Sequence, residues 1–203
     1  MRTKQEQNIN RRILYLWLPN IALDRLKRMT RGRGDENSSS NGMVIVRTEY
    51  GRRTIVATCP VSEKLGIVVG WSLGDALALH SKLLVGEIDP MKDKMELTTL
   101  ANWCGRYTPF VAFDESRIEI GERGLWLDIT GCAHLFGGEK KLLDNIIDRL
   151  CHIGLTARGV IADTPGAAWA LAHFGKLPSQ IIKPGSQQAA IADLPLIGLR
   201  LPT

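Results

Sequence analysis

Residue types able to bind metals or act as nucleophiles are scattered along this sequence of 203 residues. The four cysteines stand far apart without a CxxC pair, so the sequence predicts neither a zinc knuckle nor a thioredoxin-like redox pair. Cys132 and His134 would supply only two ligands of a tetrahedral zinc site. Gly137 and Gly138 precede basic residues but lack the spacing of a phosphate-binding loop. Local motifs of this kind therefore point to no enzyme class.

Positive charge is concentrated at the start of the chain. The formal net charge is +5, but the first 33 residues carry nine basic and two acidic side chains, and the remainder is slightly acidic. Clustered lysines and arginines suit a polyanion such as nucleic acid, because phosphate binding depends on them. A solvated helix face beside a basic tail explains the same pattern. The arginines that we assign to contacts with a DNA backbone are Arg11, Arg12, Arg52 and Arg53.

Composition excludes several broad classes of protein. Hydrophobic residues make up 44% of the chain and charged residues 23%, as in ordinary globular proteins, which argues against collagen-like, coiled-coil and disordered chains. No stretch approaches the roughly 18 consecutive apolar residues of a membrane-spanning helix. The polar, basic start lacks the apolar centre of a signal peptide. We therefore expect a cytoplasmic protein that has no membrane partner.

Apolar periodicity predicts a mixture of strands and helices. Residues 13–18 form an apolar run of strand length, residues 21–29 have helical spacing with a basic outer face, and residues 32–42 predict a mobile loop. The other expected elements are a hairpin over 43–47 and 54–59, short helices at 60–65 and from 72, a strand at 83–85, a helix over 89–107, strands at 110–113, 117–120 and 125–129, a helix over 137–153, a strand at 156–162 and a helix from 164. The order from residue 89, with the first strand added, is that of the split βαβ, ferredoxin-like fold.

Several segments resemble the Y family of DNA polymerases, the translesion group. Residues 125–138, LWLDITGCAHLFGG, are similar to the family's YLDVT…LFG segment. Residues 54–58 and 65–70, TIVAT and LGIVVG, resemble its fingers segment, and residues 161–169, IADTPGAAW, stand where the family has GIAxNKxxAK. Together with ANWCGRYTPFVAFD at residues 101–114, this wording resembles a catalytically degenerate bacterial branch of the family.

The resemblance implies a domain arrangement for this α+β chain. It predicts a basic tail at 1–12, a ferredoxin-like palm over 13–31 and 84–174, and a small inserted fingers subdomain over 32–83. Residues 175–203 would begin the connection to a thumb that lies outside this chain. Only the palm and fingers of the family would then be present.

The resemblance also implies that the first set of metal ligands is lost. Y-family chemistry uses carboxylates that converge on two Mg²⁺ ions. The family's aspartate pair on the first strand falls on Trp17 and Pro19, neither of which offers an oxygen ligand from its side chain. The aromatic residue that discriminates against ribose falls near Ala22, which is too small for that role.

The contacts that hold the triphosphate are replaced as well. The tyrosine and arginine of the family's fingers fall on Pro60 and Glu63, and the later lysine falls on Pro165. A glutamate repels a triphosphate where an arginine would clamp it. We therefore assign no catalytic residue and no resident cofactor.

One pair of carboxylates remains for comparison with the family. Asp114 and Glu115 match its second metal-binding pair if the residues before Leu125 form a hairpin insertion, whereas an alignment without the insertion places Arg123 and Gly124 there. Asp128 is instead expected to accept hydrogen bonds in a local turn.

These substitutions predict a non-catalytic, polymerase-like scaffold in translesion synthesis, DNA repair and damage-induced (SOS) mutagenesis. The resemblance implies as partners DNA, bound without sequence specificity, a sliding clamp, a RecA-like accessory subunit and an error-prone polymerase of the replicative class. Two alternatives stay open. One is an active translesion polymerase, which would need Mg²⁺, and the other is a ferredoxin-like protein-interaction module that does not bind DNA.

Overall fold

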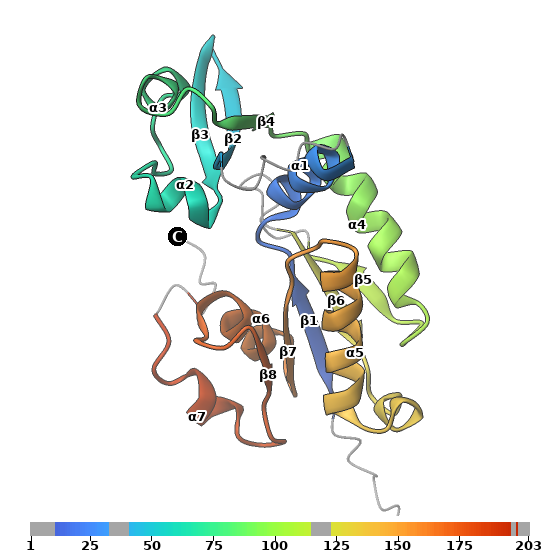
Figure 1. Ribbon diagram of the computed structural model, residues 1–203. Helices are drawn as coiled ribbons and strands as arrows, with labels where there is room; N and C mark the ends of the chain where they lie inside the picture. Colours follow the sequence, from blue (N-terminus) through green and yellow to red (C-terminus); the bar gives the residue numbers. More distant parts are fainter. Residues whose placement is uncertain (1–10, 33–40, 115–122, 196–197, 199–203) are drawn as a thin grey trace, which may run out of the picture. The chain divides into compact units, whose positions relative to one another are not determined.

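The computed structural model describes residues 11–32, 41–114, 123–195 and 198. Its contacts divide the chain into two compact units (Figure 1). The large-sheet unit takes the chain up to Pro19, Glu96–Leu150 and the chain from Ala157, and the small-sheet unit takes Asn20–Met95 and Cys151–Thr156. We describe each unit by itself.

The large-sheet unit is built on five strands in the order β5-β6-β1-β7-β8. They are β1 (Ile13–Trp17), β5 (Val111–Phe113), β6 (Gly124–Asp128), β7 (Arg158–Ala162) and β8 (Ser179–Ile181). The order β5-β6-β1-β7, with each neighbouring pair antiparallel, confirms the predicted ferredoxin-like topology, and β8 extends the sheet by pairing in parallel with β7. β1 is central and wholly apolar, and all its residues except Trp17 are buried.

Both faces of this sheet are covered, but by different helices (Figure 1). On one face, Tyr15 and Val160 pack against Trp169 of α6 (Pro165–Phe174). On the other face, a Cβ atom at Gly159 would collide with the side chain of Leu143, which belongs to α5 (Glu139–His152), so this helix lies directly on β7. The unit also contains the second half of α4 (Pro90–Cys104), a 3₁₀ helix η3 (Ala133–Phe136) and α7 (Gln187–Ile191).

The small-sheet unit has three strands in the order β3-β2-β4. They are β2 (Met43–Glu49), β3 (Arg52–Thr58) and β4 (Leu84–Glu87), accompanied by α1 (Ile21–Gly32), α2 (Pro60–Lys64) and α3 (Leu73–Leu79). The β2–β3 hairpin turns at Tyr50 and Gly51, both of which have positive φ. Buried Val44, Ile55 and Ile67 form the centre of its core. These elements agree with the hairpin, helices and strand predicted from the sequence.

The contact boundaries differ from the predicted palm and fingers boundaries at two elements. The prediction placed residues 13–31 and 84–174 together, but α1 contacts β2 and β4, and β4 pairs in parallel with β2. Both elements therefore lie in the small-sheet unit. The predicted strand at 117–120 and the centre of the predicted loop at 32–42 lie outside the described residues, whereas Gly32 ends α1. Of the helices described, none has the length and apolar character needed to cross a bilayer.

Candidate functional site

One row of side chains crosses the face of the large sheet that α6 covers. Gly124 of β6 pairs with Trp17 of β1, and Trp17 pairs with Arg158 of β7. Asp114, directly after β5, donates its backbone N–H to the carbonyl oxygen of Gly124 at 3.0 Å. The row is therefore Asp114, Gly124, Trp17 and Arg158. It brings together one position from each of the two pairs of metal ligands in the family alignment, Trp17 and Asp114.

An aromatic stack surrounds Trp17. Its indole lies on the imidazole of His173, with ring centroids 4.2 Å apart, and His173 lies in turn on Trp169 at 4.1 Å. Both contacts are nearly parallel, with interplanar angles of 26°. Trp17 is half-buried. The side chain that replaces an aspartate therefore packs against α6 and offers no lone pair to a cation.

Asp114 is buried, with 8% of its surface exposed, and its carboxylate is used by the protein. The hydroxyl of Tyr15 donates a hydrogen bond to Oδ2 of Asp114 at 2.8 Å. A Cβ atom at Gly124 would collide with the phenol of Tyr15, so glycine leaves the room that this hydrogen bond needs. Glu115 lies outside the described residues. The alternative alignment brings Arg123, which is also buried, and Gly124 to this position, and neither is a carboxylate.

Arg158 places a cation in the same row. Its guanidinium carbon lies 5.8 Å from the centroid of the Trp17 ring. Nη2 donates to the carbonyl oxygen of Leu177 at 3.0 Å and also to that of Gly175. Burial lowers the pKa of the Arg158 guanidinium, since desolvation disfavours its charge. A guanidinium at this point opposes the binding of Mg²⁺ nearby.

The described residues of this row do not fit a two-metal centre. Such a centre needs several oxygen ligands around each ion. The row offers one buried carboxylate, an indole, a glycine and a guanidinium. Elsewhere in the described part of the chain, no three His, Cys, Asp or Glu side chains stand close enough to hold a metal ion.

The replaced triphosphate positions have ordinary structural roles in the units that contain them. Pro60 and Pro165 are the first residues of α2 and α6, where proline is favoured because its missing N–H has no helical partner. Thr164 caps α6 by accepting from the N–H of Ala167 at 3.4 Å. Glu63 accepts a hydrogen bond from the hydroxyl of Thr58 at 3.1 Å.

Arg12, assigned above to a DNA backbone, is buried instead, with 7% of its surface exposed. Nε and Nη2 donate to the two carboxylate oxygens of Glu139 at 2.6 and 2.7 Å, and Nη1 donates to Asp163 at 2.5 Å. Hydrogen bonding to Glu139 raises the pKa of the Arg12 guanidinium against the effect of burial. With the bond from Nη2 to the carbonyl oxygen of Ile182, four of the five N–H groups of this guanidinium donate within the protein, which disfavours a contact between Arg12 and a phosphate.

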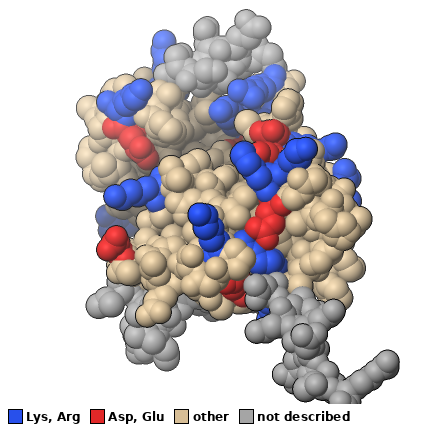
Figure 2. Space-filling view, turned by 90° about the horizontal axis from the view of Figure 1, so that it is seen from below, with Lys and Arg blue, Asp and Glu red and all other residues tan. Residues whose placement is uncertain are grey.

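The other three arginines assigned to DNA are exposed. Arg11 has 63% of its side chain exposed and pairs with Asp128 at 3.2 Å, and Arg53 pairs with Glu87 at 3.2 Å. Arg52 is exposed beside Arg53 at the start of β3. On the face drawn in Figure 2, acidic side chains stand next to basic ones, so the described residues visible there form no continuous basic surface.

Asp128 has the local role predicted for it. Its Oδ1 accepts a hydrogen bond from the backbone N–H of Thr130 at 3.0 Å. Burial disfavours the charge of Asp128, but hydrogen bonds from Thr130 and Arg11 outweigh this effect and hold the pKa of the carboxyl below its ordinary value. Tyr15 and His173 were not predicted from the sequence to lie in this row or against it. Both carry polar atoms and lie against an otherwise apolar face, which is the signal that could have marked them.

Comparisons of sequence identify curated relatives of this chain. No family model matches the chain. Protein ImuB from two strains of Caulobacter vibrioides is 47% identical over 137 residues, which cover 68% of this chain and 28% of the relative. The chain thus matches little more than a quarter of the length of these curated relatives.

Solved structures show the same fold at low sequence identity. A post-insertion binary complex of Dbh DNA polymerase superposes with a TM-score of 0.70 at 12% identity, covering 92% of this chain and 52% of the polymerase. DinB from Sulfolobus solfataricus gives a TM-score of 0.63 at 12% identity with the same two coverages. A chimera of Dbh described as a Y-family DNA polymerase gives 0.67 at 11% identity, covering 92% of this chain and 53% of the chimera. In sequence the chain is a relative of ImuB, and its fold is that of the Y-family DNA polymerases.

Proposed function

We propose that this chain is a non-catalytic, polymerase-like scaffold that serves translesion synthesis, DNA repair and damage-induced mutagenesis. The observation that carries this proposal is the row formed by Asp114, Gly124, Trp17 and Arg158. In a two-metal mechanism the ions position both the attacking and the leaving oxygen, so loss of one ligand set removes nearly all catalysis. Here the position of the first-strand ligand is occupied by the indole of Trp17, which stacks on His173. The one described carboxylate of the row accepts a hydrogen bond from Tyr15.

The proposed partners follow from the family resemblance. They are DNA, a sliding clamp, a RecA-like accessory subunit and an error-prone polymerase of the replicative class, which would carry out the synthesis in the cytoplasm. Contacts with DNA would come from exposed arginines such as Arg11, Arg52 and Arg53. Such contacts go to phosphates, so binding would be independent of sequence and would weaken steeply with salt.

Primer extension and metal binding together test the absence of catalysis. The purified chain is given a primer–template hairpin, four deoxynucleotides and Mg²⁺, beside Dbh DNA polymerase as a positive control. We expect no extension. Because the chain covers about half of the polymerase chains, a second measurement avoids any need for a complete DNA grip: Mn²⁺ titration followed by electron paramagnetic resonance. We expect no tightly bound Mn²⁺ on this chain.

Two aspartate variants make the result decisive. Asp114→Asn removes the one described carboxylate of the row, whereas Asp144→Asn changes an exposed residue of α5 that pairs with Lys140. Extension or Mn²⁺ binding that disappears in Asp114→Asn and survives in Asp144→Asn would overturn the proposal and support the active-polymerase alternative.

DNA binding separates the scaffold from an interaction module that does not contact DNA. Fluorescence anisotropy of a labelled duplex is measured at increasing salt for the chain and for an Arg52→Gln/Arg53→Gln variant. We expect the affinity to fall with salt and the double variant to show a shallower salt dependence, by about 2 in the slope of log affinity against log salt. Lack of binding at low salt by the folded chain would favour the module.

A further inference from the structure

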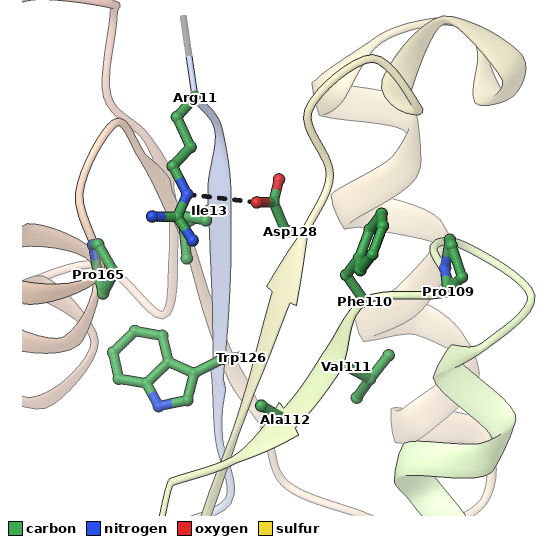
Figure 3. A pocket seen from close by; sticks show the side chains of 9 residues that line it. All are labelled: Arg11, Ile13, Pro109, Phe110, Val111, Ala112, Trp126, Asp128 and Pro165. Atoms are coloured by element: carbon green, nitrogen blue, oxygen red, sulfur yellow. Dashed lines mark hydrogen bonds and ion pairs between the residues drawn. The ribbon is translucent and has the colours of Figure 1, made fainter.

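A groove of about 520 Å³ lies on the large sheet at the end opposite the row described above (Figure 3). Its floor is formed by Ile13, Ala112 and Trp126, which lie on the three neighbouring strands β1, β5 and β6. Pro165 at the start of α6 lies on one side, and Pro109 with Phe110 lies on the other. The volume is within the range of sites that hold a ligand or a few side chains.

The groove exists because α6 covers only half of this sheet face. Alternation along the strands places Phe110 and Ala112 on the same face as Trp126. α6 packs over β1 and β7, so that among the described elements none covers the part over β5. Ala112 is exposed, and Phe110 has 71% of its surface exposed. An exposed aromatic ring beside a half-buried indole is a typical contact surface for another protein.

The backbone of β5 faces outward beside this groove. β5 is an edge strand, and its inward bonds to β6 are made in the rows of Phe110, Ala112 and Asp114. The N–H and C=O groups of Val111 and Phe113 consequently point away from β6. Among the described residues, no hydrogen bond joins these groups to another segment. Unpaired groups of this kind are a template for a further strand.

The rim of the groove is charged at one end. Nε of Arg11 donates to Oδ2 of Asp128 at 3.2 Å, and 63% of the Arg11 side chain is exposed. The remaining N–H groups of this guanidinium can donate hydrogen bonds to a carboxylate of a partner protein. Asp128 stands beside it as an anion, because its pKa lies below the ordinary value.

We propose that an extended segment of a partner protein pairs with the outer edge of β5, places an apolar side chain in this groove and directs an acidic side chain toward Arg11. Pairing with β5 supplies backbone hydrogen bonds, and alternate side chains of the added strand enter the groove over Ala112. The proposal goes beyond the scaffold function and does not depend on it. It uses the rows of Phe110 and Ala112, not the row of Asp114.

Selection from a displayed library of random peptides provides the probe. The immobilised chain is used for selection, and the most enriched peptide is synthesised with a fluorescent label for anisotropy. We expect enriched peptides to alternate apolar residues and to carry an acidic residue. In the complex, hydrogen exchange at the amides of Val111 and Phe113 should slow, because both would donate to the added strand.

Variants distinguish strand pairing from simple apolar adhesion. Val111→Pro removes one outward N–H without touching the bonds to β6, and proline is tolerated on an edge strand in this orientation. We expect it to weaken binding about tenfold, and Phe110→Ala to weaken it about fivefold. Leu135→Ala is the matched control, since Leu135 in η3 is also 71% exposed but does not line the groove, and it should bind as the unchanged chain does. Circular dichroism confirms that each variant is folded.

Arg11→Glu tests the charged rim. It should weaken binding of the acidic peptide and strengthen binding of a version in which the acidic residue is replaced by lysine. The proposal is overturned if no peptide is enriched, or if the selected peptide binds folded Val111→Pro and Phe110→Ala as tightly as the unchanged chain. It is also overturned if a labelled oligothymidylate, but no peptide, requires Phe110 for binding. Primer extension by the chain would refute the proposed function and leave this result unaffected.

Discussion

The two ends of β1 differ in the side chains that surround them. Just before the strand, Arg12 is buried and its donors meet Glu139, Asp163 and the carbonyl oxygen of Ile182. At the end of the strand, Trp17 stands where the family alignment places an aspartate, and it stacks on an imidazole. The start of β1 thus has a buried cation between two carboxylates, whereas at the end an indole stands at the position of one carboxylate.

The difference shows what each end needs. At the first end, Arg12 before β1 is bonded to three other segments, because Glu139 begins α5, Asp163 follows β7 and Ile182 follows β8. Several carboxylates around a catalytic centre would repel one another without metal ions to hold them. At the second end a single buried carboxylate remains, and it has the Tyr15 hydroxyl as a donor. The described side chains at this end are therefore packed against, or hydrogen-bonded to, one another.

The largest effect is expected at the charged end. Arg12→Met keeps much of the side-chain volume but leaves Glu139 and Asp163 facing each other without their cation. Breaking a buried ion pair on one side costs several kcal/mol, so we expect the free energy of unfolding to fall by about 3 kcal/mol. Urea unfolding followed by circular dichroism measures this change.

The control for Arg12 is an exposed ion pair on α5, the helix that also contains Glu139. Nζ of Lys140 lies 2.7 Å from Asp144, and the two side chains are 80% and 50% exposed. Lys140→Met should change the free energy of unfolding by less than about 1 kcal/mol. Equal losses in the two variants would show that the Arg12 network contributes no more than a surface ion pair.

The aromatic end should respond to Trp17→Asp without recovering chemistry. The change removes the stack on His173 and places a carboxylate in a half-buried site, so we expect a loss of about 2 kcal/mol in the free energy of unfolding. Trp17→Phe retains a ring and should lose less. Primer extension should remain absent in both variants. Tight Mn²⁺ binding by Trp17→Asp would contradict this and show that the row can still form a metal site.

Much of the fold was predictable because the local signals agree with it. The apolar run at 13–18 became the central strand, and the Thr164–Pro165 pair begins α6 as expected. In the small-sheet unit, Ser72 caps α3 by accepting from the N–H of Asp75 at 3.2 Å. β8 and α7 were not predicted, since short apolar stretches between prolines and glycines carry no clear period.

The candidate site was predictable in its losses but not in its replacements. Aligning the motifs indicated that Trp17 occupies a ligand position, yet nothing local indicated that Tyr15 would donate to Asp114, because 99 residues separate them. The partners of Arg12 could not be predicted for a similar reason, because Glu139 and Asp163 lie 127 and 151 residues away.

The smallest effect is a dependence on pH at the charged end. The N–H of Gly185 and the guanidinium of Arg12 hold the pKa of Asp163 below its ordinary value. As pH falls, the carboxyl of Asp163 therefore takes up a proton in the unfolded chain before it does so in the folded chain. The stabilisation is present above about pH 4, the ordinary pKa of an aspartate, and is lost below it. We expect a contribution below about 1 kcal/mol, because Asp163 remains near solvent.

Asp163→Asn tests this dependence by urea unfolding at pH 5, 4 and 3. The variant lacks the titrating group but keeps an oxygen for Gly185, so the free energy of unfolding should fall less between pH 5 and pH 3 than in the unchanged chain. Trp17→Phe changes the other end of β1 and introduces no titrating group, so its slope should match that of the unchanged chain. A flatter slope in Trp17→Phe would mean that the aromatic end also contains a group whose protonation differs between the folded and unfolded states. The two ends would then differ in packing but not in their use of charge.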